Sequence, residues 1–230
     1  MDYYRASEHR GTVDIGWLKS KHSFSFGHYY DPKHMGVSVL RVINDDTVMP
    51  GAGFDTHSHR DMEIISYVLK GKIEHKDSMG NHFQIPAGEV QRMSAGSGIT
   101  HSEYNASSND TLHFLQIWIK PNVMGSKPGY EQKSIPQTDK LTPLVTPDGA
   151  NGTLSIQQDA SIYRLRLKQG DSIALSTKGR TGYLHLIEGS LKTGAGQLVA
   201  GDAMAISNQS QWRVTAESQL EALWFDLPQS

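Results

Sequence analysis

Two short segments of the chain combine residue types and spacing that suit a metal site. The first contains His57 and His59, and the second contains His101 and Glu103, so that one residue separates the members of each pair. Because side chains alternate between the two faces of a β-strand, each pair would project to one side of its strand. Two such pairs on neighbouring strands would offer three imidazoles and one carboxylate to a single ion. Ligands of these types suit iron, zinc, copper, nickel, cobalt or manganese.

The composition restricts both the kind of site and the class of protein. Cysteine is absent, which excludes disulfides, zinc–thiolate sites and thiol nucleophiles, so a metal must be held by nitrogen and oxygen. The 230 residues carry a net charge of -2 without a cluster of Lys and Arg, which argues against direct nucleic-acid binding. No apolar run approaches the roughly 20 residues of a membrane helix, and the first residues lack the apolar segment of a signal peptide. We therefore expect a cytoplasmic protein without membrane contact.

The elements that must position these side chains are predicted to be short β-strands. The runs at 37–43, 62–69 and 111–119 are strand-like, and Asn44-Asp45-Asp46 is expected to close the first of them. Glycine-containing turns separate the runs at close intervals, which favours a sandwich or a barrel over a βαβ fold. No long amphipathic helix stands out, although the region 160–178 has room for a short one. The pattern predicts an all-β protein.

A change of composition divides the chain into two domains. The region 120–152 is rich in Pro, Gly, Ser, Thr, Asn and Gln, as expected of an irregular connection, and strand-like runs resume after it. We expect an N-terminal domain at residues 1–130 and a C-terminal domain at residues 131–230.

An internal repeat indicates that the two domains share one architecture. A six-residue step from glycine to serine, Gly88 to Ser94, recurs as Gly201 to Ser207. In the second copy, Leu175 and Thr177 stand where the first copy has His57 and His59. Ten of the eleven histidines precede residue 114, and only His185 lies in the second half. We therefore expect the metal site in the N-terminal domain and none in the C-terminal domain.

The motif residues resemble those of the cupin superfamily, whose fold is a β-barrel of the jelly-roll type. The first cupin motif is matched by Gly51, His57, His59, Glu63 and Gly71, and the second by Gly80, Pro86, Gly88, His101 and Asn105. Twelve residues separate Gly88 from His101, where the usual motif has two. This departure is similar to the pirin family, two-domain cupins whose bacterial members include quercetin dioxygenases. Further pirin-like segments are His22-Ser-Phe-Ser-Phe26, Leu40-Arg-Val-Ile-Asn-Asp-Asp46 and Leu115-Gln-Ile-Trp118.

The resemblance implies a fold, a ligand set and an activity. It implies a bicupin, with His57, His59, His101 and Glu103 as ligands of one divalent transition-metal ion, iron first, with nickel, cobalt, copper, manganese and zinc as alternatives. The implied enzyme is a dioxygenase that opens the central ring of flavonols such as quercetin and releases carbon monoxide, with Glu103 as catalytic base. Two alternatives stay open. One is a metal-binding regulatory protein that acts through protein partners, as pirin does in eukaryotes. The other is a cupin enzyme with another small-molecule substrate.

The other candidates are expected to have structural roles. Glu63 occupies the place of the first motif's glutamate. From the resemblance we expect it to have a structural role or to orient a histidine, instead of binding the ion. Phe24, Phe26 and Met93 are candidates for an apolar substrate pocket, with core packing as the alternative. Surface or packing positions are expected for His22, His28, His34, His75, His82 and His113.

Overall fold

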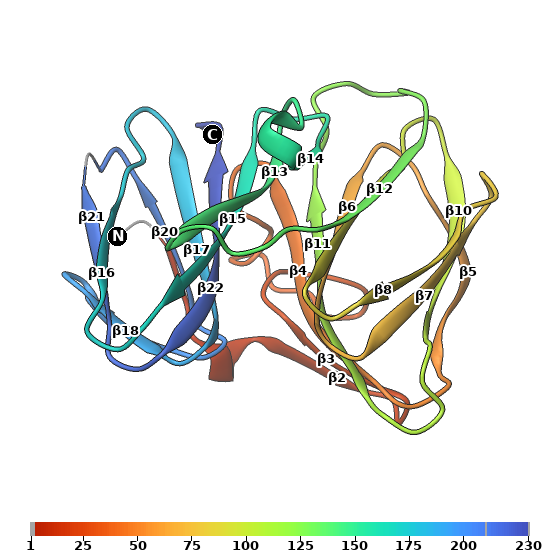
Figure 1. The fold of residues 1–230 in the computed structure, drawn as a ribbon, viewed down its shortest axis with the longest axis horizontal. Coiled ribbons are helices and arrows are strands. Elements are labelled where there is room, and N and C mark those ends of the chain that lie inside the picture. Colours follow the sequence, from red (N-terminus) through yellow and green to blue (C-terminus); the bar gives the residue numbers. More distant parts are fainter. Residues whose placement is uncertain (1–2, 210, 230) are drawn as a thin grey trace.

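The chain is described by a computed structural model for residues 3–209 and 211–229, and these residues form almost only β-strands. Two barrels stand side by side, the N-terminal one on the right of Figure 1 and the C-terminal one on the left. The helical elements of the described chain are two three-residue 3₁₀ turns, η1 (Ser7–His9) and η2 (Ala150–Gly152), and no described helix could cross a membrane. The predicted all-β fold with two tandem barrels is confirmed.

Each barrel combines a seven-stranded sheet with a four-stranded sheet. In the N-terminal barrel the larger sheet contains, in spatial order, β12 (Gly129–Ser134), β9 (Glu89–Ser94), β6 (Glu63–Lys70), β11 (Leu112–Ile119), β4 (Leu40–Val48), β3 (Leu18–His22) and β2 (Gly11–Asp14). The smaller sheet contains β5 (Gly53–His59), β10 (Ile99–Asn105), β7 (Lys72–Asp77) and β8 (His82–Pro86).

The C-terminal barrel repeats this arrangement. Its larger sheet contains β1 (Tyr3–Arg5), β20 (Ala203–Ser207), β17 (Thr181–Glu188), β22 (Leu220–Leu227), β15 (Ser161–Leu167), β13 (Leu141–Thr146) and β14 (Leu154–Ser155). The smaller sheet contains β16 (Ser172–Leu175), β21 (Trp212–Ala216), β18 (Ser190–Thr193) and β19 (Gly196–Val199). The first strand of the chain, β1, therefore belongs to the larger sheet of the C-terminal barrel, because Tyr3 pairs with Ala205 of β20. The expected boundary between residues 130 and 131 lies inside β12, which pairs with β9.

The two larger sheets share a hydrophobic core, and this explains why their strands are apolar on both faces. On β6, Ile65 and Tyr67 join a buried cluster that also contains Phe225 of the C-terminal barrel. The alternate residues Ile64 and Val68 belong to separate clusters of the N-terminal barrel. A strand covered on both sides has no reason to alternate between apolar and polar residues.

Ion pairs within the N-terminal part and a hydrogen bond between the barrels accompany this core. The side chain of Asp45 pairs with Arg10 at 3.1 Å and with His113 at 2.6 Å. Burial opposes the charge of Asp45, but its hydrogen bond with His113 and the charge of Arg10 outweigh burial and hold its pKa at about 2. Arg92 of β9 reaches across to the second barrel, where its guanidinium donates to the carbonyl oxygen of Ser155 at 2.8 Å.

Three expectations about the elements were wrong. β4 does not end before Asn44 but continues to Val48, because Asn44 and Asp46 point into the barrel while Asp45 finds its ion pairs on the other face. The region 120–152 is not wholly irregular, since it contains β12 and β13. The region 160–178 contains β15 and β16 instead of a helix, because both strands extend sheets already formed by neighbours.

Candidate metal centre

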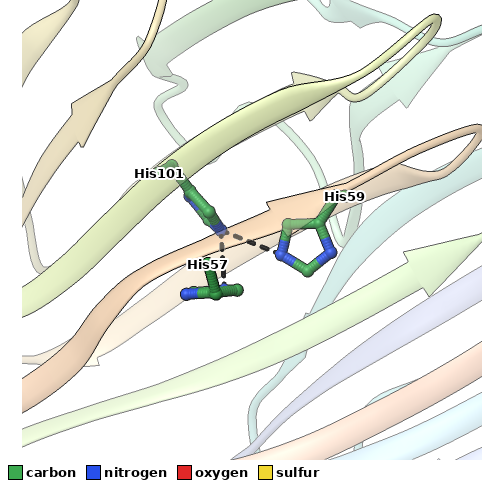
Figure 2. A group of neighbouring side chains, drawn as sticks. All are labelled: His57, His59 and His101. Carbon is green, nitrogen blue, oxygen red and sulfur yellow. Dashed lines mark hydrogen bonds between the residues drawn. The ribbon is translucent and has the colours of Figure 1, made fainter.

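Three of the four predicted ligands converge at the junction of β5 and β10. These strands pair antiparallel with His57 directly opposite His101, and alternation along β5 puts His59 on the same side as His57. Figure 2 shows the three rings turned towards one another. The Nε2 atom of His101 lies 3.1 Å from Nε2 of His57 and 3.0 Å from Nε2 of His59.

The spacing and protonation of these nitrogen atoms fit a metal ion. Two nitrogen ligands at about 2.1 Å from an ion, with a right angle between them, are about 3.0 Å apart. The Nδ1 atom of His57 lies 2.6 Å from the carbonyl oxygen of Asp55. A carbonyl only accepts hydrogen bonds, so neutral His57 carries its proton on Nδ1 and keeps the Nε2 lone pair free. The donor set therefore suits a divalent transition-metal ion bound on one side by three imidazoles.

The electrostatic environment keeps the rings in the form that binds metals. Burial lowers the pKa of His59 and of His101 to about 4, and neighbouring imidazoles act in the same direction. Both rings are therefore neutral at pH 7, as a metal ligand must be.

Glu103, the fourth predicted ligand, is a buried carboxylate held by three side-chain donors. The residue is 2% exposed. Its Oε1 accepts hydrogen bonds from Ser66 at 3.1 Å and from Gln91 at 3.4 Å, and its Oε2 accepts one from Gln116 at 3.2 Å. A buried carboxylate without such donors would be strongly destabilising.

The carboxylate is joined to the three imidazoles through His101. Glu103, His101 and His75 have ligand atoms within 4.8 Å of one another, and so do His57, His59 and His101, but the four predicted ligands do not form one such group. Burial raises the pKa of Glu103, whereas the imidazoles of His101, His75 and His57 lower it more, so that the pKa lies below its ordinary value. The Glu103 carboxylate is thus ionised at neutral pH, and its negative charge favours a cation at this site.

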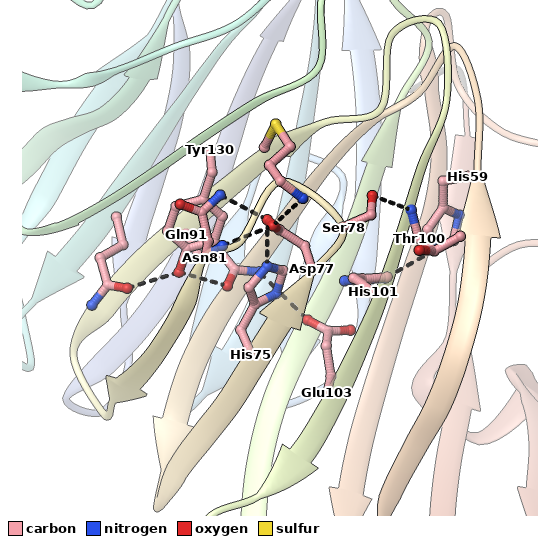
Figure 3. Close-up of polar contacts among 12 residues, drawn as sticks. His59, His75, Asp77, Ser78, Asn81, Gln91, Thr100, His101, Glu103 and Tyr130 are labelled. Carbon is pink, nitrogen blue, oxygen red and sulfur yellow. Dashed lines mark hydrogen bonds and ion pairs between the residues drawn. The ribbon is translucent and has the colours of Figure 1, made fainter.

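His75 is a member of this centre that the sequence reasoning placed at the surface or in packing. Its ring centroid lies 5.3 Å from that of His101, and its Nε2 lies 3.1 Å from Oδ2 of Asp77, with both side chains wholly buried. Figure 3 shows Asp77 at the centre of this group, where it also accepts from the backbone N–H of Met79 and from the amide of Asn81. The signal was present in the sequence, because His75 and Asp77 repeat the alternate spacing of the ligand pairs.

A row of polar side chains crosses the floor of the N-terminal barrel. Successive partners in the strand register are His22 opposite Asn44, Asn44 opposite Gln116, Gln116 opposite Ser66, and Ser66 opposite Gln91. Directly opposed residues share one face of a sheet. Gln91, Ser66 and Gln116 hold Glu103, whereas Asn44 and His22 extend past it. The sequence did not reveal this row, because each member is a single polar residue in a different strand.

His57 and His59 also line a cavity of about 190 Å³, together with His22, Asn44 and Gln116 of the polar row. Of the three apolar candidates, Phe26 lines this cavity, whereas Phe24 and Met93 are packed into hydrophobic clusters. The ring of Trp118 borders it as well, with its centroid 5.0 Å from that of His59. A larger hollow of about 920 Å³ lies beside Arg166, away from these histidines.

Glu63 has the structural one of its two expected roles, and its side-chain hydrogen-bond partner is a serine and not a histidine. Its Oε2 accepts a hydrogen bond from Ser94 at 2.8 Å, and the residue is 1% exposed. Burial raises the pKa of Glu63. Its role is to pair with the neighbouring strand β9, because odd-numbered residues of β6 face the C-terminal barrel and not the metal centre.

Within the described ranges, both groups of three potential metal ligands lie in the N-terminal barrel. In the C-terminal barrel, Leu175 and Thr177 are buried, and His185 is buried next to the charges of Arg10, Asp45 and Asp202.

Comparisons with known proteins assign both barrels to described families. The family described as Pirin matches residues 3–119, and the quercetinase C-terminal cupin domain matches residues 143–227. The expected pair of cupin domains is therefore confirmed.

Individual relatives match over the full length. A quercetin 2,3-dioxygenase of Escherichia coli strain K12 is 45% identical over 229 residues, which is 99% of each chain. A pirin-like protein of Caulobacter vibrioides is 41% identical over 222 residues, covering 94% of this chain and 95% of that protein. The crystal structure of the bacterial pirin YhhW from Escherichia coli in complex with nickel(II) has a TM-score of 0.95 at 43% identity, with 99% of each chain covered. Together with the histidine cluster, these likenesses support a divalent metal ion in this protein.

Proposed function

The chain belongs to the pirin family, and from this premise we propose that it is a metal-dependent quercetin 2,3-dioxygenase. It would open the central ring of a flavonol with dioxygen and release carbon monoxide. The observation that carries the proposal is the convergence of three imidazole Nε2 atoms, at 3.0 and 3.1 Å from the central one, beside a cavity. Its partners would be the small aromatic substrate and dioxygen.

The ligands in this proposal are His57, His59 and His101 through Nε2, with Glu103 as the fourth. The ion, iron in first place and nickel, cobalt, copper, manganese or zinc otherwise, would supply Lewis-acid chemistry for a hydroxyl group bound at these residues. Because His57 and His59 line the cavity, a substrate in the cavity would lie next to the ion.

Glu103 would receive the proton of the flavonol 3-hydroxyl. The carboxylate is charged at pH 7, because the surrounding imidazoles hold its pKa below the ordinary value in spite of its burial. Ser66, Gln91 and Gln116 keep it in place before and after the proton transfer. A general base acts efficiently when its position is fixed and its proton acceptor atom is within hydrogen-bond reach.

The activity is tested by loading metal-free protein in turn with each of the six metals. Quercetin is added, and flavonol loss and carbon monoxide release are followed together. At least one metal should support both in equal amounts. Metal retention with no flavonol loss under any of the six metals would refute the activity and favour a regulatory role through protein partners.

The ligand assignment is tested by substitution. His101→Ala should lose bound metal and turnover together, because the central nitrogen of the cluster is removed. His9→Ala is the matched control, since that ring lies in η1 with its side chain 72% exposed, and it should keep both. Unchanged metal content in His101→Ala would show that the ligands are elsewhere.

A further inference from the structure

The cavity beside the metal centre has an aromatic mouth and a polar floor. Its half-buried wall is formed by Phe26, Phe54 and Trp118 together with the two histidines of β5. Its buried wall contains the side chains of Leu18, Ser20, His22, Asn44, Asp46 and Gln116. An aromatic entrance with polar groups at the far end suits a planar ligand whose inner end carries polar substituents.

Three buried polar atoms of residues that line this cavity have no hydrogen-bond partner. They are His22 Nδ1, Asn44 Oδ1 and Trp118 Nε1. Each unpartnered buried group costs about 1–3 kcal/mol, and folded proteins keep few of them. Their concentration in one cavity indicates a surface built for a ligand that completes these hydrogen bonds.

The strands place these atoms together for a simple reason. Leu18, Ser20 and His22 alternate inward on β3, and Asn44 and Asp46 alternate inward on β4. Ser20 is opposite Asp46, and His22 is opposite Asn44 in the antiparallel register. Ser20, His22, Asn44 and Asp46 therefore lie next to one another on the cavity wall, and we call these four residues the patch.

The size of the cavity limits what can enter it. An apolar cavity of about 150 Å³ holds one benzene molecule, and sites for drug-sized ligands begin at about 300 Å³. The volume of about 190 Å³ therefore suits one substituted six-membered ring and not a fused pair. In a flavonol, two rings are fused, and a third ring hangs by a single bond from the carbon next to the one that bears the 3-hydroxyl. Only the pendant ring can enter while the 3-hydroxyl remains at the metal centre.

We propose, on the basis of the dioxygenase function proposed above, that this cavity binds the pendant ring of the flavonol and recognises its free hydroxyl groups through His22, Asn44 and Asp46. The amide oxygen of Asn44 can only accept a hydrogen bond, so it requires an O–H donor. Burial raises the pKa of Asp46 to about 7, so its carboxyl group accepts a hydrogen bond when ionised and donates one when protonated, and a hydroxyl group can meet either form. A methyl ether at the same position offers no donor and needs more space. The patch thus selects a ring with two adjacent hydroxyl groups over an unsubstituted or methoxylated ring.

The proposal is tested by binding in the absence of dioxygen. Nickel-loaded protein is titrated calorimetrically with three flavonols that share the fused rings and the 3-hydroxyl. Their pendant ring carries two adjacent hydroxyls, no substituent, or a hydroxyl and a methoxy group. Two completed hydrogen bonds should make the dihydroxy compound bind about tenfold or more tightly than the unsubstituted one. Equal affinity for all three compounds would overturn the proposal.

Substitutions assign this preference to the patch. Asn44→Val and His22→Leu change the side-chain volume only modestly while removing the polar atoms, and each should reduce the preference severalfold without loss of nickel. Asn109→Val is the matched control on the exposed loop after β10, and it should keep the full preference. Thermal unfolding shows which variants are folded. The two substitutions lie on different strands, and one folded variant is enough for the test. A folded variant with an unchanged preference would overturn the proposal.

Turnover in air separates this proposal from the proposed function. Selective binding of the dihydroxy ring without flavonol loss would leave the recognition patch standing and refute the dioxygenase activity. Flavonol loss without selective binding would support the dioxygenase activity and refute the recognition patch. Absence of any binding would overturn both.

Discussion

The buried carboxylate of Glu103 provides a sharp test of how the metal centre is supported. Gln116 donates its amide to Oε2 of Glu103 at 3.2 Å, and the residue is 7% exposed. The change Gln116→Leu keeps a similar volume but removes this donor. A hydrogen bond to a charged group contributes about 1.5–3 kcal/mol. We therefore expect metal-free Gln116→Leu to lose about 2 kcal/mol of unfolding free energy, which corresponds to a fall in Tm of about 4–8 °C.

A double-mutant cycle isolates the pair. Glu103→Gln removes the charge, so Gln116→Leu should cost much less in that background, with a coupling free energy of about 1.5 kcal/mol. Urea denaturation of the four proteins without metal measures it. Gln197→Leu is the matched control, because Gln197 donates to Glu217 at 2.6 Å on the surface, and its loss should cost less than about 0.5 kcal/mol. A coupling below about 0.5 kcal/mol would show that the polar row does not hold the carboxylate.

The remaining predictions concern the frame around the site. The pKa of Asp45 is held at about 2 instead of 3.8, so its ionised form contributes about 2 kcal/mol above pH 4, which is lost as the pH falls towards 2. Stability curves of wild type and Asp45→Asn should therefore differ at pH 7 and converge near pH 2, and parallel curves would contradict this origin. Arg92→Met leaves the carbonyl of Ser155 without its donor across the domain interface and should cost about 1–3 kcal/mol in urea denaturation. An unchanged midpoint would count against the contact. Gly182→Ala places a methyl group 2.0 Å from the ring of Trp224 and should lower the unfolding free energy by about 1–3 kcal/mol. The near-ultraviolet tryptophan spectrum should change as well. Unchanged stability and an unchanged spectrum would show that the ring moves freely.

The two pairs of proposed ligands could be recognised in the sequence because their spacing depends on local geometry. A spacing of two residues puts two side chains on one face of any strand, whatever the rest of the fold. His57 with His59, and His101 with Glu103, could therefore be singled out before the strands were placed. The same local rule would have found His75 with Asp77, had the alternation been applied to every titratable pair.

The strand ends and the supporting residues were less visible because they depend on partners far along the chain. Asn44-Asp45-Asp46 has the composition of a turn, yet β4 continues through it, since β3 and β11 on either side satisfy its backbone and two of its polar side chains face a cavity. Local propensity is a weak guide where a strand is central in its sheet.

By itself the sequence determined the all-β class, the tandem arrangement and the identity of the histidines, because each follows from composition, periodicity or short-range spacing. Only the tertiary structure decided that His101 stands between His57 and His59, that Glu103 rests on donors from β6, β9 and β11, and that unpartnered polar groups gather in one cavity. These features arise from the register between strands, and register is set by the packing of the whole barrel, which no single stretch of residues contains.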